Sequence, residues 1–82
     1  MPTGVEATLI ELVAKHFRIP RAKVDLGMSI EDVPDSLKLN ELVIDLEQHF
    51  GIAIEDSAVS RLRVLRDLVP LVQERIASSG RR

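Results

Sequence analysis

Residues 33–43 of this chain read Val33-Pro34-Asp35-Ser36-Leu37-Lys38-Leu39-Asn40-Glu41-Leu42-Val43. Pro34 disfavours helix before it and Asp35 is a good N-cap, so a helix is expected to begin at Ser36. Apolar residues then recur at helical spacing, and Gly51 is a natural left-handed cap for a helix over residues 36–50. A serine hydroxyl beside the positive end of a helix dipole suits a covalently attached phosphate, although most Asp-Ser pairs only cap helices.

The N-terminal part of the chain is predicted to be a helix followed by a long loop. Residues 5–18 place apolar side chains on one face. Ile19-Pro20 ends this helix, because a residue before proline avoids helical geometry. Residues 19–34 are expected to form a loop with intermittent apolar anchors. A short strand at residues 24–30 is the alternative, although no partner strand is evident.

The C-terminal part is predicted to contain two further helices. A short helix is expected over about residues 57–62 and a longer one over about residues 64–77. Pro70 lies inside the longer pattern, so it either kinks that helix or moves its start closer to Pro70. Residues 78–82 are expected to be a disordered basic tail. The predicted fold is an all-α bundle of three to four helices with a long first loop.

Composition limits the classes of function. A chain of 82 residues, 45 % hydrophobic and 29 % charged, is expected to form one globular domain over residues 1–82. It has no cysteine, so any thiol chemistry must arrive on a cofactor. No apolar run approaches the length of a membrane span and the N-terminus lacks a signal-peptide core, so a cytoplasmic protein without membrane insertion is predicted.

The charges are unevenly distributed along the chain. Residues 31–56 hold eight acids and one base, a net charge of −7, whereas residues 57–82 hold six arginines and two acids, a net charge of +4. Residues 1–30 contribute +1, which gives −2 for the whole chain. The acidity therefore surrounds Ser36. It suggests docking to basic patches of partner proteins, and a merely solvated helix face is an equally good explanation from charge alone.

Taken together, residues 5–77 resemble an acyl carrier protein. The resemblance rests on Asp35-Ser36-Leu37, Glu41-Leu42-Val43, Leu46-Glu47, Phe50-Gly51-Ile52-Ala53-Ile54 and Val64-Leu65-Arg66-Asp67-Leu68-Val69. It implies that Ser36 carries 4′-phosphopantetheine through a phosphodiester. The thiol of that group would hold acyl or aminoacyl groups as thioesters for delivery between enzymes of fatty acid, lipid or secondary-metabolite biosynthesis. The chain itself would not be an enzyme.

The resemblance also implies roles for residues near Ser36. Asp35 matches a residue that helps hold the metal when the modifying phosphopantetheinyl transferase is docked, and Leu37 matches the apolar residue that the transferase recognises. Glu41 and Glu47 match acidic positions that partner enzymes contact. The predicted docking set is Glu41, Asp45, Glu47, Lys38, Arg61 and Arg63. The predicted acyl pocket is lined by Leu39, Leu42, Leu46, Ile54, Leu62 and Leu68.

Several positions depart from the family pattern. Val33-Pro34 stands where many members have a glycine-containing pair, and Lys38 stands where an acid is common. Arg61, Arg63 and Arg66 make the third-helix region basic. These departures predict a specialised carrier with its own acyl- or aminoacyl-loading ligase and its own acyl-transferring or synthase enzymes. The carrier is expected to be a monomer. The residues leave the cargo open among fatty acyl, polyketide, amino acid and lipid-A-type groups.

Other functions are less well supported by the residues. His16 and His49 are expected to pack or to interact with helix ends rather than to act in catalysis, and no metal site or catalytic residue is predicted. The arginines invite a nucleic-acid hypothesis, but the domain is net acidic and no helix-turn-helix joint is evident, so no nucleic-acid partner is expected. The runner-up is a carrier-like helical interaction module without the modification, which would tolerate Ser36→Ala.

Overall fold

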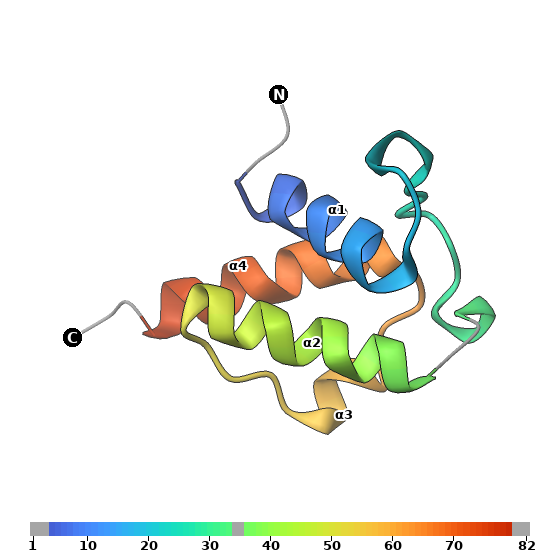
Figure 1. Cartoon of the computed structure of the whole chain (residues 1–82). Helices are drawn as coiled ribbons and strands as arrows, with labels where there is room; N and C mark the ends of the chain where they lie inside the picture. The colour runs from blue at the N-terminus through green and yellow to red at the C-terminus, as the bar shows by residue number, and fades with distance from the viewer. Residues whose placement is uncertain (1–3, 34–35, 80–82) are drawn as a thin grey trace.

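The computed structural model describes residues 4–33 and 36–79. Within them the chain forms four α-helices and three single 3₁₀ turns, so the predicted all-α bundle is confirmed (Figure 1). In chain order the elements are α1 (Gly4–Phe17), η1 (Arg21–Lys23), η2 (Ile30–Asp32), α2 (Ser36–Phe50), α3 (Asp56–Val59), η3 (Leu65–Asp67) and α4 (Leu68–Ser79). No helix of these residues is long and apolar enough to cross a membrane.

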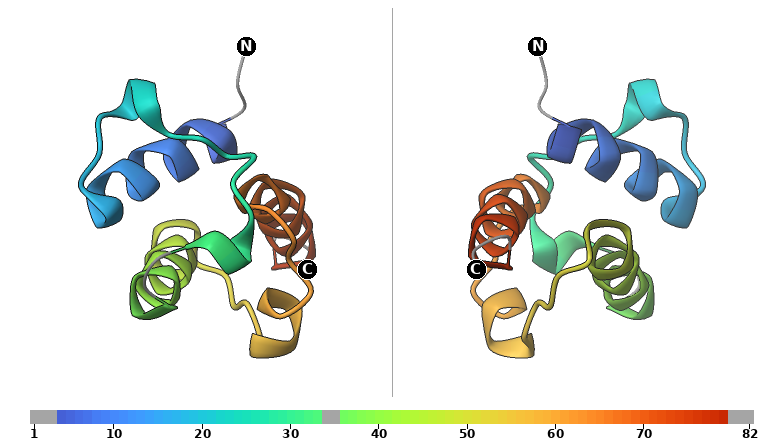
Figure 2. Two further views of the ribbon diagram at one scale, coloured as in Figure 1. Left: turned by 90° about the vertical axis from the view of Figure 1, so that its right-hand side faces the viewer. Right: turned by 90° about the vertical axis from the view of Figure 1, so that its left-hand side faces the viewer.

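The core lies between α1, α2 and α4, and the short α3 lies beside α2 and α4 at one edge (Figure 2). Each long helix presents one apolar face to this core, as the helical spacing predicts. Five leucines are fully buried there, and burial of each such side chain contributes roughly 1.5–3 kcal/mol. They are Leu9, Leu42, Leu46, Leu65 and Leu68.

The two longest helices agree with the prediction because local residues fix their ends. α2 spans Ser36–Phe50 as expected, and Gly51 follows it with a φ of 65°. α1 spans Gly4–Phe17, one residue earlier at each end than predicted. The next residue, Arg18, has a φ of 58°, although a non-glycine residue is strained in the left-handed region. Its neighbour Ile19 donates its N–H to the carbonyl of Ala14.

The C-terminal helices differ in length from the prediction. α3 covers only Asp56–Val59 instead of residues 57–62, and the final helix is divided into η3 and α4. α4 starts at Leu68, so Pro70 occupies its first turn, where the missing N–H of proline breaks no helical hydrogen bond. This is the predicted shift of the helix start. α4 continues through Ser79 into the predicted tail, and residues 80–82 lie outside the described part.

The long first loop is tied to the segment before α4, and the alternative of a strand at residues 24–30 is wrong. The N–H groups of Arg66 and Leu65 donate to the carbonyls of Leu26 and Met28 at 2.7 and 3.0 Å, and the N–H of Ile30 donates to the carbonyl of Arg63 at 2.8 Å. We call this pairing of residues 26–30 with residues 63–66 the loop ladder. It contains one isolated bridge, between Ser29 and Val64, rather than a strand.

Candidate functional site

Ser36 is the first residue of α2, so the serine singled out by the sequence opens a helix of 15 residues. Asp35 lies outside the described residues. The first N–H groups of an α-helix lack intrahelical acceptors, and the helix dipole is positive at that end. The first turn of α2 carries no acidic side chain, and Lys38 adds a positive charge there. A singly charged phosphodiester fits this end of the helix.

One stripe of α2 faces solvent and contains both apolar and polar side chains. Leu37 is 61 % exposed and Ile44 is 46 % exposed, which makes them the large apolar residues that the described part leaves most open. Glu41 and Gln48 are also exposed and continue the same spacing of three and four residues. We call Leu37, Glu41, Ile44 and Gln48 the outer stripe of α2.

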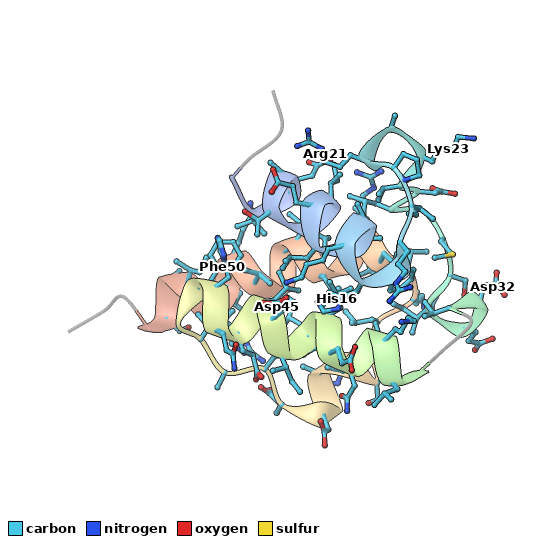
Figure 3. The ribbon with its side chains drawn as sticks, viewed as in Figure 1. His16, Arg21, Lys23, Asp32, Asp45 and Phe50 are labelled. Atoms are coloured by element: carbon cyan, nitrogen blue, oxygen red, sulfur yellow. The ribbon has the colours of Figure 1, made fainter. Side chains whose placement is uncertain are left out.

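Asp45, predicted to dock partners, faces α1 instead. Its Oδ2 atom lies 2.9 Å from Nε2 of His16 and 3.5 Å from Nζ of Lys15, and Figure 3 shows the two labelled side chains between α1 and α2. Glu41 approaches Nδ1 of the same imidazole at 3.8 Å. The hydrogen bond with His16, together with the charge of Lys15, lowers the pKa of Asp45 against the opposing effect of burial.

Glu47, the other acid predicted to dock partners, is used within the fold. Its Oε2 atom accepts the backbone N–H of Ile54 at 2.7 Å, and the carbonyl of Glu47 accepts the N–H of Ile52. These bonds hold the chain that leaves α2 against the core. Of the three predicted acids on α2, only Glu41 keeps about half of its side chain, 52 %, in contact with solvent.

The predicted docking arginines lie on the turn between α3 and the loop ladder. Arg61 and Arg63 are both exposed, and neither forms an ion pair with any residue that the structure describes. Arg66 differs, because its guanidinium bonds to Glu6 of α1 at 3.3 Å. Lys38 on α2 is partly buried. The exposed guanidinium groups of this region that form no ion pair with a described residue are therefore those of Arg61 and Arg63. We call residues 60–63 the arginine turn.

The six residues of the predicted acyl pocket divide into two groups. Four are buried members of the core, and two are only partly buried and pack against it: Leu42, Leu46, Ile54 and Leu68 in the first group, Leu39 and Leu62 in the second. Leu62 also lines an open groove of about 510 Å³ between α3 and α4. Protein cores are close-packed, so an acyl chain entering between these residues has to displace existing contacts.

Comparison with known proteins shows the family to which the chain belongs. The family described as "phosphopantetheine attachment site" matches residues 7–72, most of the chain and the whole of α2. The chain belongs to this family. Proteins of the family are carriers rather than enzymes. They hold 4′-phosphopantetheine covalently and interact with phosphopantetheinyl transferases and acyl-handling enzymes.

Individual relatives support the same membership. The carrier domain is similar to the acyl carrier protein of Exiguobacterium sibiricum, with 32 % identity over 68 residues that cover 80 % of this chain and 86 % of that protein. It is also similar to the acyl carrier protein of Zymomonas mobilis, with 30 % identity over 66 residues covering 78 % and 85 % of the two chains. The acyl carrier protein of Chlamydia muridarum is 36 % identical over 61 residues, or 61 % and 79 % of the chains.

The sequence did not reveal some residues that shape the site. Ile44 had a usable signal, because an apolar residue seven positions after Leu37 falls on the same helix face. The hydrogen bonds of Asp45 and Glu47 left no signal in the local sequence, because their partners lie outside α2. His16 packs partly buried against Asp45 and His49 lies edge-on to Phe50, with ring centroids 4.8 Å apart. Among the described residues, no cluster of three or more His, Asp or Glu side chains is placed to hold a metal ion.

Proposed function

We propose that this chain is a carrier whose Ser36 hydroxyl is joined to 4′-phosphopantetheine by a phosphopantetheinyl transferase. The main support is the position of Ser36 at the first residue of α2, within the part of the chain that the family matches. Since the chain has no cysteine, its thioester chemistry needs a thiol from the cofactor. When bound, the group supplies that thiol, which holds acyl or aminoacyl groups as thioesters.

The residues around Ser36 have separate tasks in this proposal. The start of α2 stabilises the phosphodiester through its dipole, and Lys38 adds a charge of the right sign. Asp35 and Leu37 serve the transferase, by holding its metal and by giving it an apolar contact. Glu41 docks partner enzymes, whereas Asp45 and Glu47 contribute mainly by holding α2 in place.

We also propose that the chain is a specialised, monomeric carrier formed by a single domain. The specialisation is supported by the exposed guanidinium groups of Arg61 and Arg63, which form no ion pair with a described residue, together with Lys38 in the first turn of α2. Such a surface favours a dedicated loading ligase and dedicated acyl-transferring enzymes of lipid or secondary-metabolite biosynthesis over the general enzymes of fatty acid synthesis. Equal rates of acyl loading and transfer with both sets of enzymes would contradict this specialisation.

The experiment that tests the carrier function is an intact-mass measurement. The protein is incubated with coenzyme A, Mg²⁺ and a broad-specificity phosphopantetheinyl transferase. The wild type is expected to gain one phosphopantetheine, and Ser36→Ala is expected to gain none. Ser57→Ala is the matched control, since Ser57 lies exposed in the first turn of α3, and it should gain the group normally. No gain by a folded wild type would favour the unmodified interaction module.

A further inference from the structure

The arginine turn is held in a fixed position beside the segment that leads to Ser36. The N–H of Arg63 donates to the carboxylate of Asp67 at 2.9 Å, and its carbonyl accepts the N–H of Ile30 in η2 at 2.8 Å. Arg61 and Leu62 donate their N–H groups to the carbonyls of Ala58 and Val59. The backbone that presents both arginines is therefore ordered before any partner arrives, which lowers the entropic cost of binding.

The charges of Arg61 and Arg63 lie near the carboxylates of Glu55 and Asp67 and help to lower the pKa values of those two acids, but neither guanidinium is held in an ion pair among the described residues. By contrast, Arg66, Arg75 and Arg21 each bond to a carboxylate. An exposed guanidinium is suited to bidentate bonds with carboxylates. The opposite sign is presented by Glu41 on the outer stripe of α2, between the apolar side chains of Leu37 and Ile44.

We infer that the enzyme which loads or unloads this carrier docks with an acidic patch on the arginine turn. The same enzyme contacts the outer stripe of α2 with an apolar and basic surface. This inference rests on the proposed carrier function and specifies the chemistry of the partner. Charges of both signs fix the orientation of the partner, because a rotated complex would place like charges together. A partner that carries only a basic patch is repelled at residues 61 and 63.

The test uses two peptides of opposite charge as probes and follows the backbone amide signals of the ¹⁵N-labelled holo-protein at low salt. A glutamate-rich peptide is expected to shift the signals of residues 60–66. A lysine-rich peptide is expected to shift those of α2 around Glu41. Salt should weaken both effects. Failure of the protein to become modified refutes the carrier function. The same titration of the unmodified chain then still shows whether the arginine turn binds the glutamate-rich peptide.

Two double variants with equal changes in charge make the test specific. R61E/R63E should lose the shifts caused by the glutamate-rich peptide and keep those caused by the lysine-rich one. R21E/K23E changes two exposed cations on η1, which lies on the side of α1 away from α2 in Figure 3. This variant should keep the shifts caused by both peptides. The milder R61Q/R63Q should weaken the shifts caused by the glutamate-rich peptide. It replaces R61E/R63E in the test if that variant is misfolded. Absent shifts at residues 60–66 of the wild type, equal shifts around η1, or shifts that persist in R61E/R63E would overturn the inference.

Discussion

His16 and Asp45 join α1 to α2 through a contact of 2.9 Å between Nε2 and Oδ2. The imidazole is 15 % exposed and the carboxylate 28 % exposed, so water screens the contact only in part. The two residues come from distant parts of the sequence and hold together the helices on either side of the core. The pair adds to the packing of Leu42, Val43 and Leu46 in the core, which also holds α2 in place.

Replacement of Asp45 by Asn should lower the free energy of unfolding by about 1 kcal/mol at neutral pH. The pKa of Asp45 is lowered by the hydrogen bond with His16, so the ionised carboxyl stabilises the folded state. This contribution is complete above the usual pKa of 3.8 and disappears as the pH falls through the lowered folded value. Urea titrations of both proteins from pH 7 to acid should therefore converge. A difference that stays constant with pH would contradict this account.

Replacement of Glu47 by Ala should destabilise the protein by about 1–2 kcal/mol, because it leaves the partly buried N–H of Ile54 without its acceptor. The neighbouring change Gln48→Ala removes an exposed side chain and should cost almost nothing. Chemical denaturation measures both. Equal stabilities of the two variants would show that Glu47 has no structural role.

Replacement of Arg18 by Gly should stabilise the protein by about 1 kcal/mol, because a β-carbon is strained at a φ of 58°. Arg18→Ala keeps the β-carbon and loses only the exposed charge, so it separates backbone strain from electrostatics. The melting temperature should rise for glycine and stay close to the wild-type value for alanine. An equal rise for both variants would assign the effect to the charge.

Replacement of Asp67 by Ala should cost about 1–2 kcal/mol and loosen the arginine turn. Its carboxylate accepts the N–H groups of Arg63 and Val64, and these two bonds lower the pKa of Asp67. Hydrogen exchange of the Arg63 and Val64 amides should accelerate more than that of the α1 amides. Asp32→Ala, at an exposed acid of η2, is the control that should leave these amides protected.

Modification of Ser36 should raise the melting temperature of the protein by a few degrees. A phosphodiester at the start of a helix contributes about 0.3–1 kcal/mol through the dipole, and each kcal/mol moves the melting temperature of a domain of this size by roughly 4–8 °C. The increase should be smaller in Lys38→Glu, which places a negative charge in the first turn of α2. Lys23→Glu on η1 should show the wild-type increase. Identical increases in melting temperature in both variants would show that the charge of Lys38 does not affect the stability gained by modification of Ser36.

The sequence predicted those parts of the fold whose signals are local. The stretch from Pro34 to Ser36 and the glycine at position 51 define the ends of α2, and the spacing of apolar residues defines the faces of the long helices. The predicted length of α3 was wrong: the helix ends at Val59 instead of residue 62. The backbone of Arg63 bonds to Asp67 and Ile30, and these bonds outweigh the preference of residues 60–62 for helical geometry.

The site was predictable to a similar extent. The local pattern predicted that a helix begins at Ser36, as the structure shows. Leu37 and Glu41 were singled out by the resemblance to carrier proteins, and their roles stay predictions. Asp45 and Glu47 have the same local pattern as Glu41, yet their carboxylates serve α1 and Ile54. A single sequence cannot distinguish these acids, because the difference depends on which element packs against each one.

The loop ladder also imposes an order on the biosynthesis of the protein. The carbonyls of Leu26 and Met28 and the N–H of Ile30 obtain their partners only after residues 63–66 have been made. On a growing chain α1 and α2 can therefore pair before the segment that leads to Ser36 is fixed in place. A ribosome that stalls before Arg63 would hold a chain with its α2 complete and residues 26–30 still unanchored. For the proposed carrier, modification during translation is therefore expected to be poor, and the transferase is expected to act on the finished chain.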